Sequence, residues 1–214
     1  MTLAAHAFGG LHVLADDDPR WPLDPIEQAQ HACIGGASVV QLRAKHATDR
    51  EALAWGRAIR TLTRDAGVRF VVNDRFDLAL ACEADAVHLG QADLPPQALP
   101  TAARKQLAVG RSTHDLEQAL SARGEAIDYM AFGPVFGTTS KTSEYSPRGT
   151  DALAQIVHLA APLPVVAIGG IDVSNVGEVV DAGAAGAAVI SAVAAAPDAS
   201  HATHELVRRM GARR

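Results

Sequence analysis

Short apolar runs alternate with amphipathic segments along the whole chain. The runs predict strands at Leu11–Ala15, Ser38–Lys45, Arg69–Asp74, Ala86–Gly90, Ala108–Thr113, Asp128–Phe136, Pro164–Gly170 and Gly186–Val193. Several runs are continuously hydrophobic, as residues 165–168 are, and strands buried on both faces of a parallel sheet have this pattern. The pattern therefore predicts parallel strands joined by helices.

Helix-start signals lie between these runs. Asp24 and Glu27 have the spacing of a capping box, and Thr48 and Glu51 have the same spacing before a second amphipathic segment. Ser174 is expected to cap a third helix, whose valines share one face. Each predicted strand is thus followed by a segment that can form a helix.

Eight strand–helix units without a break in composition predict one α/β domain over residues 1–214, closed as a (β/α)₈ TIM barrel with parallel strands. A doubly wound open sheet is the alternative. The first strand is not followed by the glycine pattern of dinucleotide-binding folds, which disfavours that alternative.

Composition narrows the classes of function. The chain has 214 residues, 48% of them hydrophobic, and a net charge of −5, so no overall basic field favours nucleic acid. No apolar run approaches the length of a membrane span, and we expect a cytoplasmic protein without membrane or nucleic-acid partners. Cys33 and Cys82 do not form a Cys-x-x-Cys pair, and buried inert thiols are the favoured interpretation.

Polar side chains gather where predicted strands end, which is where barrel enzymes build their active sites. Gln41, Arg43 and Lys45 alternate along the second strand, so we expect all three on one side, with Ala44 on the other. They predict a cradle for an anion at the barrel mouth. The alternative is a strand end whose basic side chains extend into water.

Asp74 and Asp93 follow the third and fourth predicted strands. Carboxylates at adjacent strand ends can share one ion, and Mg²⁺ commonly uses one or two carboxylates with water and phosphate oxygens. The alternative is that each residue caps the helix that follows it.

The ends of the last four predicted strands favour a phosphate-binding site. Ser112 ends the fifth strand, either as a ligand or as a helix cap, and the hydroxyl-rich segment 137–141 follows the sixth. Gly170 and Ser191 lie at the ends of the seventh and eighth strands, where barrels frequently bind phosphate. A tight glycine turn is the alternative at residue 170.

In order, these segments resemble the thiamine-phosphate synthase (thiamine monophosphate pyrophosphorylase) family. The matching segments are Gln-Leu-Arg-Ala-Lys (41–45), Val-Asn-Asp-Arg (72–75), Val-His-Leu-Gly-Gln-Ala-Asp-Leu (87–94), Gly-Arg-Ser-Thr-His (110–114), Gly-Pro-Val-Phe (133–136), Thr-Thr-Ser-Lys (138–141) and Ala-Ile-Gly-Gly-Ile (167–171). The resemblance covers nearly the whole chain, and the ordered set is specific although no single segment is.

The resemblance implies a TIM-barrel transferase of thiamine biosynthesis. It would join 4-amino-2-methyl-5-pyrimidinylmethyl diphosphate to a thiazole ethyl phosphate and release pyrophosphate. Early cleavage of the bond to pyrophosphate would leave a pyrimidinylmethyl cation, which the thiazole nitrogen captures. Such a step needs neutralisation of the diphosphate charge and exclusion of water, for which closure of residues 137–146 is the candidate. A homodimer would be unsurprising.

Roles carry over by position. The pyrimidine diphosphate would be held by Gln41, Arg43, Lys45, Asn73, Ser112 and Lys141. The thiazole phosphate would be held by Thr138, Ser140, Gly170, Ile190 and Ser191. Asp74 and Asp93 would bind Mg²⁺. The candidate catalytic residues are Arg43, Lys45, Ser112 and Lys141. His88 and His114 are expected to be hydrogen-bonded structural histidines, and a role in proton transfer is the alternative for each.

Three positions depart from the family pattern. Ala44 stands where an acidic residue is common, Gly137 where proline is common and Ser140 where threonine is common. Ala44 is expected to face away from the site, and the serine retains the hydroxyl. Gly137 could loosen the loop, which affects the expected rate and not the type of reaction.

Two rival functions use the same barrel. A thiazole tautomerase would keep the thiazole-phosphate site without needing Asp74, Asp93 or Lys141. A non-catalytic sensor would bind the thiazole phosphate at Gly170 and Ser191 without a metal site. Mg²⁺-dependent release of pyrophosphate separates the synthase from both.

Overall fold

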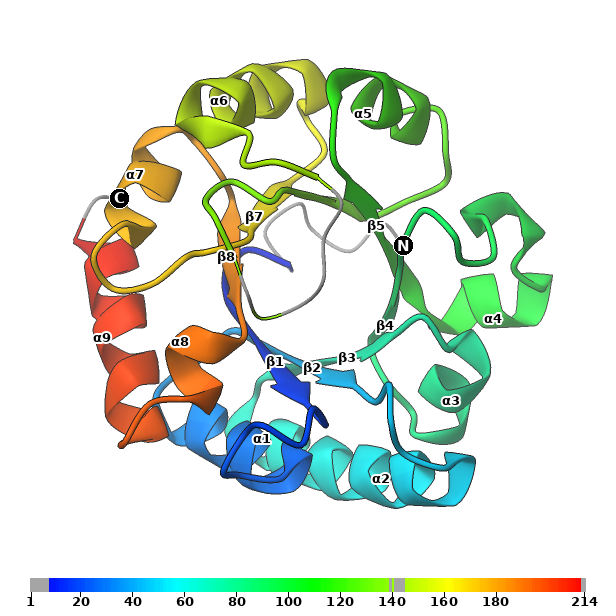
Figure 1. The fold of residues 1–214 in the computed structure, drawn as a ribbon. Helices are drawn as coiled ribbons and strands as arrows, with labels where there is room; N and C mark the ends of the chain where they lie inside the picture. The colour runs from blue at the N-terminus through cyan, green and yellow to red at the C-terminus, as the bar shows by residue number, and fades with distance from the viewer. Residues whose placement is uncertain (1–7, 139, 141–144, 213–214) are drawn as a thin grey trace.

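The structure is a computed structural model and describes residues 8–138, 140 and 145–212. Its strands form a closed barrel of eight parallel strands in sequential order, and helices surround it as an outer ring (Figure 1). The predicted TIM barrel is therefore confirmed, and the open-sheet alternative is wrong.

The strands are β1 (Gly10–Asp16), β2 (Val39–Arg43), β3 (Arg69–Asn73), β4 (Ala86–Leu89), β5 (Ala108–Thr113), β6 (Tyr129–Phe132), β7 (Val165–Ile168) and β8 (Gly186–Val189). The helices are α1 (Pro25–Ile34), α2 (Asp49–Ala66), α3 (Phe76–Ala81), α4 (Thr101–Gln106), α5 (Leu116–Ala122), α6 (Gly149–Ala160), α7 (Val176–Asp181), α8 (Ser191–Ala194) and α9 (Ala199–Gly211). Within the described ranges, no helix is both long and apolar enough to cross a bilayer.

Local signals explain where α1 and α2 begin. Both predicted capping boxes form: Asp24 with Glu27 begins α1, and Thr48 with Glu51 begins α2. The predicted cap at Ser174 is wrong. Its hydroxyl donates to Asp172 at 2.5 Å, and α7 begins after the next residue without a side-chain cap.

Several strands end earlier than the apolar runs predicted. β2 ends at Arg43, so Lys45 lies in the following loop. The apolar run that contains β6 continues past the end of the strand, which stops before Gly133. The run that contains β8 continues into the short helix α8, where Val193 is buried. An apolar run cannot by itself distinguish a strand from a buried loop or a buried helix, and this explains the overestimates.

Alternate strand residues fill two separate apolar regions. Val40 and Leu42 of β2 belong to the layer between the barrel and its helices, and Ala44 packs against the same layer. Val39 belongs to the cluster inside the barrel, which also contains Tyr129. The interior therefore receives every second side chain, and its polar members lie toward the carboxyl ends of the strands.

Candidate active site at the carboxyl ends of the strands

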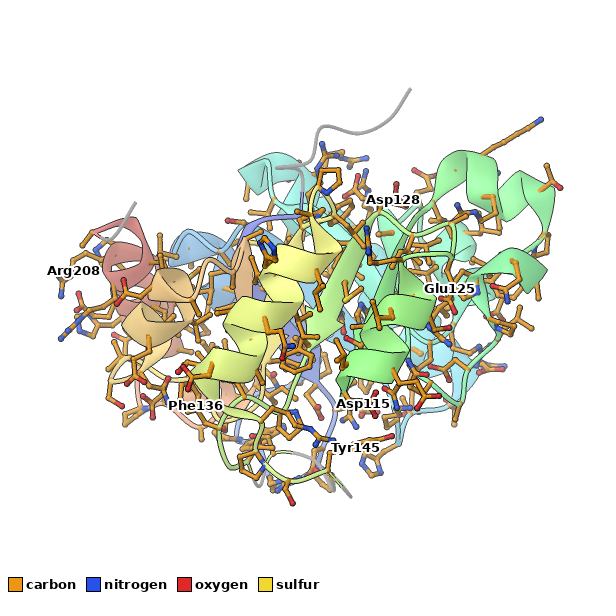
Figure 2. All side chains as sticks on the ribbon, turned by 90° about the horizontal axis from the view of Figure 1, so that it is seen from above. Asp115, Glu125, Asp128, Phe136, Tyr145 and Arg208 are labelled. Carbon is orange, nitrogen blue, oxygen red and sulfur yellow. The ribbon has the colours of Figure 1, made fainter. Side chains whose placement is uncertain are left out.

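Two neighbouring pockets open at the carboxyl end of the barrel. The inner pocket is lined by His12, Leu14, Gln41, Arg43, Asn73, His88, Ser112, Tyr129, Ala131, Val166, Ile168 and Ala188. The rim pocket is lined by His114, Gly133, Pro134, Thr138, Ser140, Ile168, Gly169, Gly170, Ile171, Ala188, Val189, Ile190 and Ser191. Figure 2 places Asp115 and Tyr145 at this end of the barrel, and Asp128, which precedes β6, at the opposite end. The two pockets share Ile168 and Ala188, so they meet at a common wall.

The two predicted metal ligands lie together beside the inner pocket. The carboxyl group of Asp93 lies close enough to that of Asp74 to raise its pKa. Burial raises the pKa of the Asp74 carboxyl, the Lys45 ammonium opposes this shift, and the Asp93 carboxyl adds to it. The two carboxyl groups are adjacent, and one of them has a raised pKa. The positive charge of a divalent cation would stabilise both groups in their ionised form, so the pair could hold such an ion.

Local backbone geometry aims each carboxylate. Asp74 has φ +65°, which is uncommon for a residue with a Cβ, and its amide donates to His88 O at 2.7 Å. Asp93 accepts from the amide of Gly90 at 2.6 Å. Neither residue caps a helix: α3 lacks a side-chain cap, and after Asp93 the chain forms a short 3₁₀ turn at Pro96–Ala98. The capping alternative is therefore wrong for both.

The two basic side chains of the predicted anion cradle, Arg43 and Lys45, each form an ion pair with an aspartate. Arg43 donates to Asp16 at 2.6 Å, and the Asp16 side chain is fully buried. Lys45 pairs with Asp74, which places its ammonium at the carboxylate pair. Gln41 is buried in the inner pocket, where Arg43 also lies. The prediction that all three face one side is therefore compatible with the structure, although Lys45 reaches the site from a loop.

Among apolar side chains, the rim pocket carries hydroxyl groups and closely approaching backbone. Ser140 donates to Ser191 Oγ at 2.8 Å, and its amide donates to Thr138 Oγ1 at 3.2 Å. Gly170 has φ +63°, and a Cβ there would lie 2.3 Å from Gly137 O. Only glycine fits this approach of two loops. Lys141 lies outside the described residues.

Two residues at the site were missed by sequence reasoning. Asp16 fixes Arg43, and the buried side chain of Gln28 in turn fixes Asp16: its Oε1 accepts from Asp16 N at 3.0 Å and its Nε2 donates to Asp16 O at 2.9 Å. Asp17 accepts from the backbone amides of residues 45–47 and so shapes the loop after β2. The parallel register, which only the structure shows, places Asp16 opposite Arg43 on the neighbouring strand.

The fold and site define a class: a (β/α)₈-barrel enzyme whose polar pocket groups lie at the carboxyl ends of the strands. Within that class, a model of the family described as thiamine monophosphate synthase matches residues 11–193, and the chain belongs to this family. Thiamine-phosphate synthase from Chlorobium phaeovibrioides is 45% identical over 94% of this chain and 93% of that protein. The synthase from Natronomonas pharaonis is 47% identical over 85% of each.

A solved structure agrees with these relatives. Thiamine phosphate pyrophosphorylase from Pyrococcus furiosus superposes with a TM-score of 0.86 and 36% identity, over 98% of each chain. The activity of the chain is therefore that of a thiamine-phosphate synthase, a transferase that releases pyrophosphate.

Proposed function

We propose that the inner pocket holds the aminopyrimidine diphosphate, that the rim pocket holds the thiazole phosphate, and that thiamine phosphate forms where the two pockets meet. The observation that carries this assignment is their shared wall of Ile168 and Ala188. Ligands on the two sides of one wall can present their reacting atoms to each other without a large movement of either.

The carboxylates of Asp74 and Asp93 are the proposed ligands of Mg²⁺. Among the described residues, no group of three or more His, Cys, Asp or Glu side chains gathers as a metal site. Two carboxylates suit Mg²⁺, which keeps several waters and takes substrate phosphate oxygens in addition. When bound, Mg²⁺ would neutralise negative charge on the diphosphate as it departs.

The diphosphate end of the substrate is assigned to the basic residues around this pair. Arg43 enters from β2 with its orientation fixed by Asp16, and Lys45 lies against Asp74. Lys141 belongs to the same proposed set. Gln41 and Asn73 line the inner pocket and offer amide groups to the aminopyrimidine, and Ser112 completes this pocket. Together these side chains would stabilise charge on the leaving group and leave the ring end in an enclosed space.

The thiazole phosphate is assigned to the rim pocket. Thr138, Ser140 and Ser191 supply hydroxyl groups there, and Gly170 and Ile190 bring backbone to the same pocket. Arg20 donates to the carbonyl of Ser140 at 3.0 Å and ties this wall to the loop after β1. Closure of residues 137–146 over both ligands would exclude water, which would otherwise trap the pyrimidinylmethyl cation.

Asp93→Asn tests the metal assignment. The substitution keeps the size of the side chain and removes its charge, so Mg²⁺-dependent release of pyrophosphate from the two substrates should fall roughly 100-fold or more. Asp65→Asn, an exposed position on α2, is the matched control and should release pyrophosphate like the unchanged protein. Wild-type rates for Asp93→Asn at saturating Mg²⁺ would show that the metal ligands are elsewhere.

Three further expectations belong to the proposal. Residues 1–214 would act as one barrel domain, the protein would work in the cytoplasm, and a homodimer would be compatible with the open barrel mouth. The two substrates are small molecules, and gel filtration with light scattering would measure the oligomeric state directly.

A further inference from the structure

A short chain of polar side chains crosses the floor of the inner pocket. The hydroxyl of Tyr129 lies 3.0 Å from His88 Nδ1, and His88 Nε2 lies 2.8 Å from Ser112 Oγ. Tyr129 and His88 are buried, whereas Ser112 is half-buried and lines the inner pocket. The chain therefore runs from inside the barrel to the proposed substrate.

Strand register makes this contact possible. Gly110 of β5 pairs with His88 of β4 on one side and with Tyr129 of β6 on the other. A Cβ on Gly110 would lie 2.2 Å from Tyr129 Cζ and 2.5 Å from His88 Nδ1. The histidine and the tyrosine thus meet across the middle strand only because that strand carries glycine there.

The tyrosine ring is held firmly. It stacks on Phe8 with 4.9 Å between ring centroids, and its exposed fraction is 1%. Burial raises the pKa of the Tyr129 phenol far above its usual value, and the charge of Asp128 raises it further, so the phenol keeps its proton. Its hydroxyl can therefore act as a donor at every pH at which the protein works.

Only one direction of hydrogen-bond donation gives an acceptor to the hydroxyl hydrogen of Tyr129. Within the described ranges, His88 is the only hydrogen-bond partner of the Tyr129 hydroxyl. If His88 carried its proton on Nδ1, the phenolic hydrogen would be buried without an acceptor, which is the costly arrangement. If Tyr129 donates to Nδ1, the proton of neutral His88 lies on Nε2 and points at Ser112 Oγ. The hydroxyl hydrogen of Ser112 is then not used in the bond to His88. Ser112 lines the inner pocket, so this hydrogen can point into it.

We propose that Tyr129 and His88 are positioning residues that orient the Ser112 hydroxyl as a donor to the pyrimidine diphosphate. This inference rests on the proposed function, which assigns Ser112 to that substrate. A serine hydroxyl normally rotates between donor and acceptor roles. Here the donation from His88 takes one of the two acceptor sites on the Ser112 oxygen and turns the hydroxyl hydrogen away from His88, so that this hydrogen is available to an acceptor atom of the substrate.

The first test is a double-substitution cycle measured as kcat/KM for the pyrimidine diphosphate. Tyr129→Phe keeps the stacked ring and removes the donor, and Ser112→Ala removes the end of the chain. Each should lower kcat/KM roughly tenfold, the size of one neutral hydrogen bond, and leave the KM for thiazole phosphate unchanged. Because Tyr129 acts through Ser112, Tyr129→Phe should cost nothing more in the Ser112→Ala background.

Thr113→Val is the matched control for loss of a buried hydroxyl. Thr113 lies next to Ser112 on β5 but donates to Ala131 O at 3.0 Å and does not line the pocket. Its substitution should leave kcat/KM unchanged. A double variant that loses the product of both single effects, or a Tyr129→Phe protein with wild-type kinetics, would overturn the proposal.

The second test does not need turnover. Long-range ¹H–¹⁵N correlation spectra report which ring nitrogen carries the proton, and His88→Gln identifies the His88 signals by their disappearance. We expect the Nε2–H tautomer in the ligand-free protein and a mixture with Nδ1–H in Tyr129→Phe. A pure Nδ1–H tautomer in the unchanged protein would reject the proposal. Absence of pyrophosphate release would reject the proposed function instead, and the tautomer would still decide the positioning roles.

Discussion

The inner pocket and the rim pocket are built in different ways. The inner pocket takes its polar groups from strands, and two of them are fixed by a neighbour: Asp16 holds Arg43, and Tyr129 holds His88. The rim pocket takes its hydroxyl groups from loops and from the start of α8, where Ser140 contacts Ser191, and Gly170 allows close backbone approach. On the proposed assignment, the pyrimidine diphosphate would enter a site set by the barrel, whereas the thiazole phosphate would need groups from separate loops.

Among the substitutions that compare the two pockets, Asp16→Asn should produce the largest effect, and only on the inner pocket. It removes the buried charge that orients Arg43, and breaking such a pair costs roughly 3 kcal/mol in the free energy of unfolding. The kcat/KM for pyrimidine diphosphate should fall at least roughly tenfold, because outer partners of a site commonly have that effect. Steady-state kinetics and urea unfolding measure the two quantities. An unchanged KM for thiazole phosphate would support the difference between the two pockets. An equal loss of kcat/KM for both substrates would contradict it.

Gly170→Ala should have the next largest effect, on the rim pocket alone. The added Cβ would lie 2.3 Å from Gly137 O at a residue with φ +63°, so the two loops must separate. We expect the KM for thiazole phosphate to rise roughly tenfold, with roughly 1–3 kcal/mol lost from the free energy of unfolding.

The control for Gly170→Ala is Gly36→Ala. Gly36 has φ +85°, but a Cβ added there would meet nothing within 4 Å, so its substitution introduces backbone strain without a clash. It should lower stability and leave both KM values unchanged. If the two alanine variants have the same kinetics, the close approach at residue 170 does not shape the rim pocket.

The smallest effect is a pH dependence of stability that arises inside the barrel. Burial lowers the pKa of His12 to about 4, and its Nε2 lies 2.9 Å from Phe8 O. Since the pKa is near 6.5 in the unfolded chain, unfolding takes up a proton between these values, and stability is lost as the pH falls through that range. The loss should reach about 2 kcal/mol near pH 5.

Urea unfolding of the unchanged protein and of His12→Gln at about pH 7.5 and pH 5 isolates this contribution. The variant should lose less stability on acidification. The same loss in both proteins would mean that His12 becomes charged in the folded barrel. That result would contradict the lowered pKa of the buried His12.

The sequence predicted the barrel because its signals were local or periodic. Capping boxes such as Asp24 with Glu27 act over four residues, and buried parallel strands give continuous apolar runs. Strand ends were less accurate, since the apolar run that ends β8 continues into α8. Local patterns therefore predicted which elements form better than where they stop.

The site was predictable only where residue type itself suggests chemistry. Asp74 and Asp93 were predicted to be neighbours from their strand ends, and they lie within reach of each other. Tyr129 gave no such signal, because it belongs to an apolar run and its role depends on a contact across β5. Asp16 was equally hidden in a run of three aspartates. Partners that fix other residues depend on register, which residue type does not report.

A crystal structure of the protein with Mn²⁺ and pyrophosphate, phased to locate manganese by its anomalous signal, tests the central claim directly. We predict one manganese ion between the carboxylates of Asp74 and Asp93, in contact with pyrophosphate oxygens that also meet Arg43. A manganese ion elsewhere, with pyrophosphate away from the inner pocket, would contradict that claim.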